Sequence, residues 1–348
     1  MTLPDGIARL CVTTPRLTAS VLERPGAPGG PTVVFIHGNV SSSLFWQGAM
    51  RDLPAAVRAL ALDLRGFGDS EPLPVDATRG VRDFSDDVAS VLDELGVGRA
   101  HVVGWSMGGG VAMQLLLDSA DTVDSLTLVA PVSPYGFGGT AADGSLLTAD
   151  AAGTGGGGVN PQFVLSLDAQ DTTADAPTTA RSVYRTAYVA DPAAVTLEDT
   201  WVESMLTTVT GLGNYPGDSM PSDNWPGFAP GDHGVLNTMA PTHFNVSGIV
   251  DIPRKPPILW IRGTADAIVS DASFFDLNHL GAVGAIPGWP GEQAAPAQPM
   301  IAQTRAVLDR YRAAGGAYRE IAIEGCGHSP HLEHPDVFNE ALRDVLDV

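Results

Sequence analysis

Apolar residues follow two alternating patterns along the first part of the chain. Short runs of aliphatic and β-branched residues at 32–36, 58–62, 100–103 and 125–129 are typical of buried strands. Between them, residues 84–95 place their apolar side chains near one face of a helix. This alternation predicts a mostly parallel sheet with helices on both of its faces.

The alternation stops near residue 131 and resumes near residue 258. Residues 131–257 are rich in glycine and threonine, and they contain one candidate helix at 192–207. They also carry many large aromatic residues, which argues against a disordered linker. We therefore interpret 131–257 as an inserted lid, and 1–130 together with 258–348 as the core of the domain.

Further elements are expected before and after the lid. A hairpin should open the chain at 8–13 and 17–22, and a short helix should cover 44–53. The later elements, in chain order, are a strand at 258–262, an irregular insertion at 273–299, a helix at 301–313, a strand at 319–323 and a helix at 335–346.

Length and composition fit one large domain with an insertion. The chain has 348 residues, of which 44% are hydrophobic. No stretch approaches the roughly 20 uninterrupted apolar residues of a membrane span, and the N-terminal residues do not resemble a secretory signal. The two cysteines, Cys11 and Cys326, lie far apart and nothing favours a disulfide, so we expect a cytoplasmic protein.

The chain is strongly acidic. Its formal charge of −21 comes from 40 acidic and 19 basic residues, which argues against nucleic acid and membranes as partners. A single lysine beside abundant arginine, alanine and glycine suggests a GC-rich bacterial genome, whereas adaptation to high salt is an alternative explanation of the acidity. The expected partner is a small-molecule substrate, and the oligomeric state stays open.

A serine stands where a predicted strand turns sharply into a helix. In Gly104-Trp105-Ser106-Met107-Gly108 a glycine lies two residues away on either side of the serine. Such a turn needs neighbours without side chains, because the strand and the helix crowd those positions. It also puts the N–H of Met107 at a helix N-terminus, where it can stabilise an oxyanion.

A serine nucleophile needs a base and an acid that orients the base. Asp266 and His328 each follow a predicted strand, as Ser106 does, so all three belong at the sheet edge where such folds collect ligands. Asp271 competes for the acid role but lies further from its strand. No carboxylate directly follows the strand that ends at Val129, which removes the other usual position of the acid.

With these motifs the chain resembles an α/β-hydrolase. The resemblance covers 8–131 and 258–348, and five motifs occur in the order of that family. They are His37-Gly38, Asp63-x-Arg65-Gly66-x-Gly68-x-Ser70, the serine turn, Gly263-Thr264-Ala265-Asp266 and Gly327-His328.

The resemblance implies Ser106 as nucleophile, His328 as general base and Asp266 as its orienting acid. It also implies an oxyanion hole made by the N–H groups of Met107 and Asn39. His37, Asp63 and Arg65 would hold loops rather than touch substrate.

No cofactor or metal is expected. Residues 328, 331 and 334 are histidines, but one belongs to the triad, and prolines at 330 and 335 break any helix that would align them.

Large side chains near the serine and in the lid are candidates for substrate contact, although packing is an equal alternative for each lid residue. If several line the pocket, the substrate is largely apolar. The candidates are Trp46, Trp105, Trp201, Met205, Tyr215 and Trp225.

The triad candidates and the family resemblance together predict a serine hydrolase that cleaves a carboxylic ester or lactone through an acyl-enzyme on Ser106. A serine at this position counts against dehalogenation and epoxide hydrolysis. A C–C bond hydrolase would need a cation for a second carboxylate, for which Arg181 and Arg185 are the candidates in the lid. The same triad would also serve a cofactor-free perhydrolase, and the fold is compatible with a ligand-binding protein without turnover.

Overall fold

A computed structural model describes residues 3–346 and contains one large sheet. Its eight strands lie in the order β1-β2-β4-β3-β5-β6-β11-β12. β1 and β2 form an antiparallel hairpin, β2 pairs antiparallel with β4, and every other neighbouring pair is parallel. The strands are β1 (Ala8–Thr13), β2 (Thr18–Arg24), β3 (Thr32–Ile36), β4 (Arg58–Leu62), β5 (Ala100–Trp105), β6 (Val123–Val129), β11 (Ile258–Gly263) and β12 (Tyr318–Ile323).

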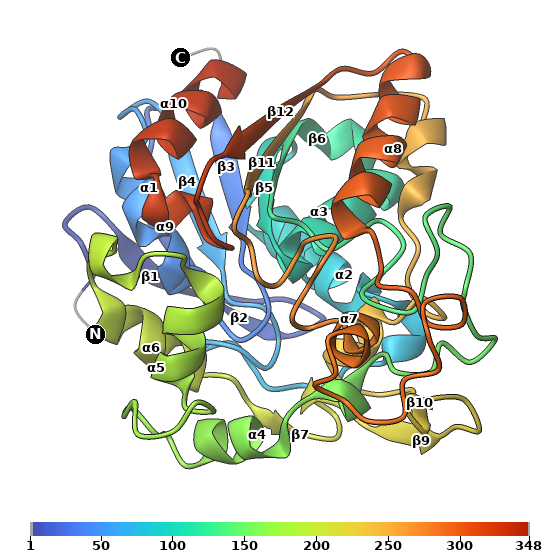
Figure 1. Cartoon of the computed structure of the whole chain (residues 1–348). Coiled ribbons are helices and arrows are strands. Elements are labelled where there is room, and N and C mark those ends of the chain that lie inside the picture. The colour runs from blue at the N-terminus through green and yellow to red at the C-terminus, as the bar shows by residue number, and fades with distance from the viewer. Residues whose placement is uncertain (1–2, 347–348) are drawn as a thin grey trace.

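Helices cover both faces of this sheet (Figure 1). α1 (Gln47–Asp52) and α10 (Pro335–Leu346) contact each other on one face. α2 (Arg82–Glu94), α3 (Met107–Asp118) and α8 (Met300–Ala313) lie on the other. This arrangement confirms the α/β class, and its cause is visible in β3, where four successive apolar residues are fully buried because both faces of the strand are covered.

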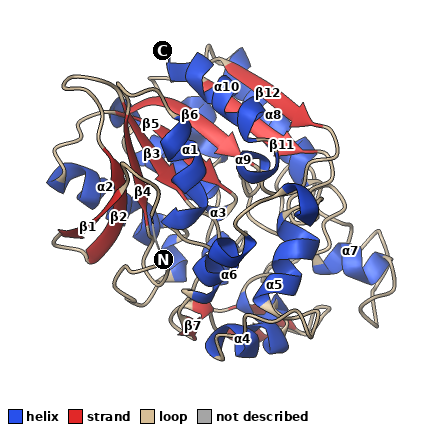
Figure 2. Ribbon diagram, turned by 90° about the vertical axis from the view of Figure 1, so that its left-hand side faces the viewer, coloured by secondary structure: helices blue, strands red, loops and turns tan. Residues whose placement is uncertain are grey.

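The segment 131–257 adds no strand to the eight-stranded sheet, and its helices lie at one end of it (Figure 2). Its longer elements are α4 (Pro161–Asp168), α5 (Ala180–Val183), a π-helical turn (Tyr184–Tyr188) and α6 (Glu198–Leu206). The short strands are β7 (Thr210–Gly211), β8 (Tyr215–Pro216), β9 (Ser219–Pro221) and β10 (Phe228–Pro230). Side chains of this segment share one hydrophobic cluster with the sheet, and the boundaries of core and lid stay a prediction.

Two expectations for the irregular segments are corrected. The helix expected at 192–207 is only a 3₁₀ turn at Pro192–Ala194 followed by α6, because Leu197 is left-handed with φ 64° and separates the two. The insertion at 273–299 contains a helix, α7 (Leu277–Ala282). Asp276 caps α7 by accepting the N–H of Asn278 at 3.0 Å, a local signal that hydrophobic periodicity does not carry.

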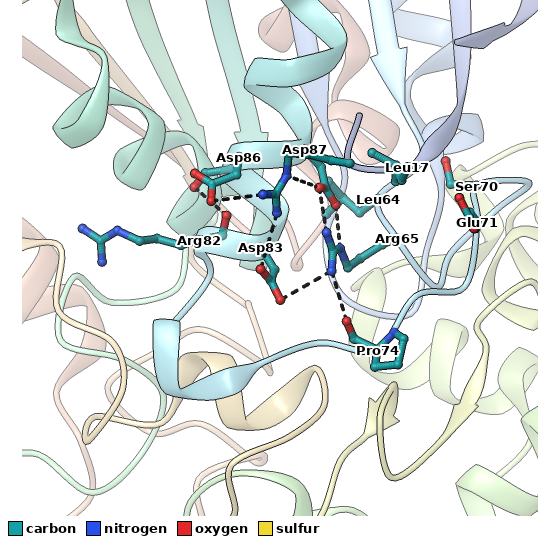
Figure 3. A network of polar contacts seen from close by, with 12 residues as sticks. Leu17, Leu64, Arg65, Ser70, Glu71, Pro74, Arg82, Asp83, Asp86 and Asp87 are labelled. Atoms are coloured by element: carbon teal, nitrogen blue, oxygen red, sulfur yellow. Dashed lines mark hydrogen bonds and ion pairs between the residues drawn. The ribbon is translucent and has the colours of Figure 1, made fainter. Parts of the chain in front are cut away.

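A buried ion pair joins the loop after β4 to helix α2 (Figure 3). Arg65 donates from Nε and Nη2 to the two carboxylate oxygens of Asp87, at 2.6 and 2.7 Å. Its Nη1 donates to the carbonyl of Pro74 at 3.0 Å and lies 3.4 Å from the carboxylate of Asp83. Arg65 therefore holds a loop, as the resemblance implies, and its charge is compensated by carboxylates that are buried with it.

Replacement of Asp87 by asparagine should lower the free energy of unfolding by about 3 kcal/mol, because Arg65 stays buried without its bidentate partner. Urea denaturation measures the effect. Asp93→Asn on the exposed side of the same helix is the matched control, and it should change stability by less than about 0.5 kcal/mol. Equal stability of the two variants would contradict a structural role for the pair.

Candidate active site

The serine turn has the crowded geometry that its glycines predict. Ser106 lies between β5 and α3 with φ 57°, a positive value that is rare for residues other than glycine. A Cβ at Gly104 would lie 2.2 Å from the carbonyl oxygen of Gly108, and one at Gly108 would lie 2.4 Å from that of His37. Glycine is therefore required at both positions for the turn to form.

His328 and Asp266 meet at the ends of two neighbouring strands. The loops after β12 and β11 bring the Nδ1 of His328 to 2.8 Å from the Oδ2 of Asp266, and both side chains are buried. Oδ1 of Asp266 accepts the N–H groups of Ile268 and Val269 at 2.8 and 3.0 Å. A carboxylate at Nδ1 keeps the proton on that nitrogen, which leaves Nε2 as the base.

Asp271, the other candidate for the acid, lies at the start of α8 and not beside His328. Its Oδ1 accepts the N–H groups of Ile301 and Ala302, at 2.7 and 3.2 Å, in the first turn of α8. The carboxylate thus caps a helix, and the hydrogen bond to His328 is made by Asp266 instead.

Ser106, His328 and Asn39 all line one cavity of about 350 Å³. The hydroxyl of Ser106 makes no hydrogen bond with the part of the chain that the structure describes, and catalytic hydrogen bonds commonly tighten only with substrate bound. Most of the wall is apolar, with Phe137, Phe163, Met239, Val269, Phe274 and Phe275 among its residues.

The charged side chains of this cavity bear on the kind of ligand that it can hold. Among the described residues that line it there is neither a lysine nor an arginine. Asp276 is part of the wall, and its oxygens accept the N–H groups of Asn278 and Gln298 at 3.0 and 2.7 Å. Burial raises the pKa of Asp276. The described part of the wall therefore offers no lysine or arginine as counter-ion to an anionic ligand.

The loop after β3 lies directly against the serine. A Cβ at Gly38 would lie 3.0 Å from the Cβ of Ser106, so the chain at Gly38 passes Ser106 closely. Between residues 3 and 346, the N–H groups of Asn39 and Met107 have no acceptor. Met107 is the first residue of α3, where N–H groups lack intrahelical partners.

His37 braces this loop as a neutral side chain. Its Nε2 accepts the N–H of Leu64 at 3.0 Å, so Nδ1 carries the proton and donates to the carbonyl of Gly38 at 2.7 Å. Burial lowers the pKa of His37 to about 4. Asp63 also holds backbone, since it accepts the N–H groups of Ser43 and Asp69 at 2.8 and 3.1 Å.

Of the six side chains predicted to contact substrate, all within the described part of the chain, only Tyr215 lines the cavity. Trp46, Trp105, Trp201 and Met205 are buried elsewhere in the core. Trp105, for example, donates its indole N–H to the carbonyl of His328 at 2.8 Å, so it supports the histidine loop from behind the cavity. Trp225 donates to the carbonyl of Pro287 at 3.0 Å.

Sequence reasoning did not single out several residues of the wall. Tyr188 lies in the predicted lid, and Phe274 and Phe275 come from the second insertion. These segments have neither strand nor helix periodicity to indicate the direction of a side chain. Their aromatic content was the available signal, and it indicates that the segment contributes to a cavity wall without indicating which of its residues does so.

His331 packs in the core close to His328. Its ring lies 4.4 Å from that of Trp46 and 4.9 Å from that of Trp105, measured between centroids. Within the described residues neither ring nitrogen has a hydrogen-bond partner, and burial lowers the pKa of His331 to about 3. No group of three or more potential metal ligands was found in residues 3–346.

Comparison with known proteins assigns the family. The model of the alpha/beta hydrolase family matches residues 33–341, which is most of the chain, and the chain therefore belongs to this family. The carboxylesterase CesB from Bacillus subtilis has a similar structure, with a TM-score of 0.59 over 99% of this chain and 92% of that protein. At 16% identity this likeness shows the fold alone.

Curated relatives match over shorter stretches. The chain is 44% identical over 110 residues to the dihydrolipoyllysine-residue acetyltransferase component of the acetoin cleaving system of Cupriavidus necator. It is 36% identical over 101 residues to the pimeloyl-[acyl-carrier protein] methyl ester esterase of Aeromonas hydrophila. These matches cover 32% and 29% of this chain, and only 28% and 38% of the relatives' own lengths. In residues 3–346 no helix is both long and apolar enough to cross a membrane.

Replacement of His331 by phenylalanine should reduce the decrease in the free energy of unfolding that occurs as the pH falls. The folded-state pKa lies below the unfolded value of about 6.5, so the unfolded chain binds more protons between these values and stability falls as the pH drops. Phenylalanine keeps a ring between the two tryptophans and cannot take up a proton. Urea denaturation from pH 7 to pH 4 tests this, and parallel curves for both proteins would contradict it.

Proposed function

We propose that this protein is a serine hydrolase that cleaves a carboxylic ester or lactone of a small, uncharged and largely apolar molecule. The observation that carries the proposal is the cavity, in which Ser106 and an Asp266-paired His328 face a mostly apolar wall whose described residues include neither lysine nor arginine. Membership of the hydrolase family supports the reaction class. An esterase among the partial relatives fits an ester bond.

In the proposed reaction His328 Nε2 takes the proton of Ser106 as Oγ attacks the substrate carbonyl carbon. The oxygen of that carbonyl becomes an oxyanion, which the N–H groups of Asn39 and Met107 stabilise. The C–O bond to the alcohol then breaks, and the alcohol leaves with the proton from His328. Water, deprotonated by the same nitrogen, then attacks the acyl carbon. The bond from that carbon to Ser106 Oγ breaks, Oγ takes back the proton from His328, and the carboxylic acid leaves.

The C–C hydrolase alternative lacks its cation. Arg181 and Arg185 both bind the carboxylate of Glu198, and Arg181 also donates to Asp199 at 2.7 Å. Neither arginine lines the cavity within the described chain. A carboxylate-bearing substrate would therefore meet an uncompensated cost of desolvation.

The setting of the reaction is proposed from the same features. A small molecule is the expected partner, and neither nucleic acid nor a membrane surface suits a chain with a charge of −21. Cys11 and Cys326 are both free thiols, which fits the cytoplasmic location proposed from the sequence.

Ser106→Ala should lower kcat on p-nitrophenyl esters by about 10⁴-fold or more, because no covalent intermediate can form. It should also abolish labelling by a fluorophosphonate. Ser119→Ala, at the far end of the same helix, is the control and should keep wild-type kcat. A variant that binds ester as the wild type does, with no turnover by either protein, would favour a binding protein instead.

A neutral ester should be preferred over a matched anionic one. We expect kcat/KM for p-nitrophenyl butyrate to exceed that for mono-p-nitrophenyl glutarate by at least tenfold, since one unpaired buried charge costs more than the 1.4 kcal/mol that tenfold represents. Steady-state kinetics on both substrates at low ionic strength provides the test. Preference for the anionic ester would contradict the proposed substrate class.

A further inference from the structure

One short segment of the predicted lid touches both loops that carry the proposed catalytic groups. Tyr188, at the end of the π-helical turn, donates its hydroxyl to the carbonyls of Asn39 and Val40, at 2.9 and 3.1 Å. Its ring packs against Trp105 and His328, with centroids 5.7 and 6.2 Å apart. Burial raises the pKa of Tyr188, so the phenol keeps the proton that it donates.

The loop that receives this hydroxyl does not adopt a relaxed conformation. Val40 has φ 45°, and a β-branched residue in this region is a steric outlier. Such a conformation persists only where its surroundings impose it. The bond from Tyr188 to the carbonyls of residues 39 and 40 is a restraint of this kind, applied next to the N–H of Asn39.

The other end of the segment is tied to the histidine loop. Glu333 Oε2 accepts the N–H of Ala190 at 2.7 Å and that of Asp191 at 3.4 Å. Its Oε1 accepts the N–H of Gly327, the residue before His328, at 2.8 Å. A Cβ at Gly327 would lie 2.6 Å from the nitrogen of Ala190, so the two backbones are in direct contact.

We propose that residues 188–191, which we call the strap, hold the oxyanion loop and the histidine loop in their working positions. Tyr188 and Glu333 are the positioning residues, and neither takes part in the bond changes. The inference rests on the proposed function, because it gives the strap a positioning role in the same proposed active site. It predicts that the strap acts mainly on transition-state stabilisation rather than on substrate affinity.

The size of the effect follows from the geometry of oxyanion stabilisation. A donor helps only when it lies within hydrogen-bond distance of the oxygen in the transition state, and a displacement of about 1 Å can cost about 100-fold in rate. Without its restraint, the peptide that carries the Asn39 N–H can relax away from the strain at Val40. The loss should therefore appear in kcat.

Tyr188→Phe tests the oxyanion side of the strap, and Tyr184→Phe is its matched control. Tyr184 lies in the same π-helical turn and is fully buried, but its hydroxyl has no hydrogen-bond partner among residues 3–346. We expect Tyr188→Phe to lower kcat on p-nitrophenyl butyrate by roughly 10- to 100-fold, with KM changed less than about twofold. Affinity for phenylboronic acid, which forms a tetrahedral adduct on serine, should fall with kcat, and Tyr184→Phe should match the wild type.

Glu333→Gln tests the histidine side, and Glu324→Gln, on the exposed part of the loop between β12 and His328, is the control. The amide keeps one acceptor and turns an NH₂ group toward a backbone N–H, so one of the two ties is lost. We expect kcat and the rate of fluorophosphonate labelling at Ser106 to fall about tenfold for Glu333→Gln, and to stay unchanged for Glu324→Gln. Thermal denaturation by circular dichroism accompanies each variant, and Glu333→Gln carries the test if Tyr188→Phe does not fold.

The outcomes separate the strap from the proposed function. Wild-type kcat and labelling in Tyr188→Phe, or an equal loss in Tyr184→Phe, overturn the oxyanion half of the proposal. An unchanged Glu333→Gln overturns the histidine half. Wild-type protein that is labelled at Ser106 but hydrolyses no ester contradicts the proposed substrate class alone, and the labelling rates of the variants then decide on the strap.

Discussion

The close approach of β5 and α3 around Ser106 is the constraint on which the proposed site depends. The serine has a positive φ at this turn, and neither Gly104 nor Gly108 has room for a Cβ atom. Such a turn is costly on its own, and it persists because buried strands surround β5 on both sides. The sheet therefore supplies the stability that holds Ser106 in this turn at the carboxyl ends of the strands.

Parallel pairing gives the remaining groups their places. β11 and β12 are neighbours in register, and the loops after them bring Asp266 and His328 together in a buried pair. The loop after β3 passes the serine closely at Gly38. Side chains that are more than 200 residues apart thus share one cavity, because the carboxyl ends of the strands share one edge.

The segment between β6 and β11 has two roles in this arrangement. It supplies much of the apolar wall, through residues such as Phe163 and Tyr215. Through Tyr188 it also contacts the backbone beside the proposed oxyanion donors. The same segment therefore both lines the cavity and contacts the loop beside Ser106. A substitution in this segment that alters the cavity wall can therefore also displace the loops that carry Asn39 and His328.

The sheet, its flanking helices and the motifs at the strand ends could be predicted from the sequence, because strand and helix periods and the glycine requirement of the serine turn are local properties. Which large side chains face the cavity could not be predicted in this way, because it depends on contacts made in the folded chain. Trp105 and Trp201 pack in the core, whereas Tyr188, Phe274 and Phe275 line the cavity. Their segments lack a regular period, so the direction of each side chain depends on contacts with residues distant in the chain, such as that of Tyr188 with residues 39 and 40.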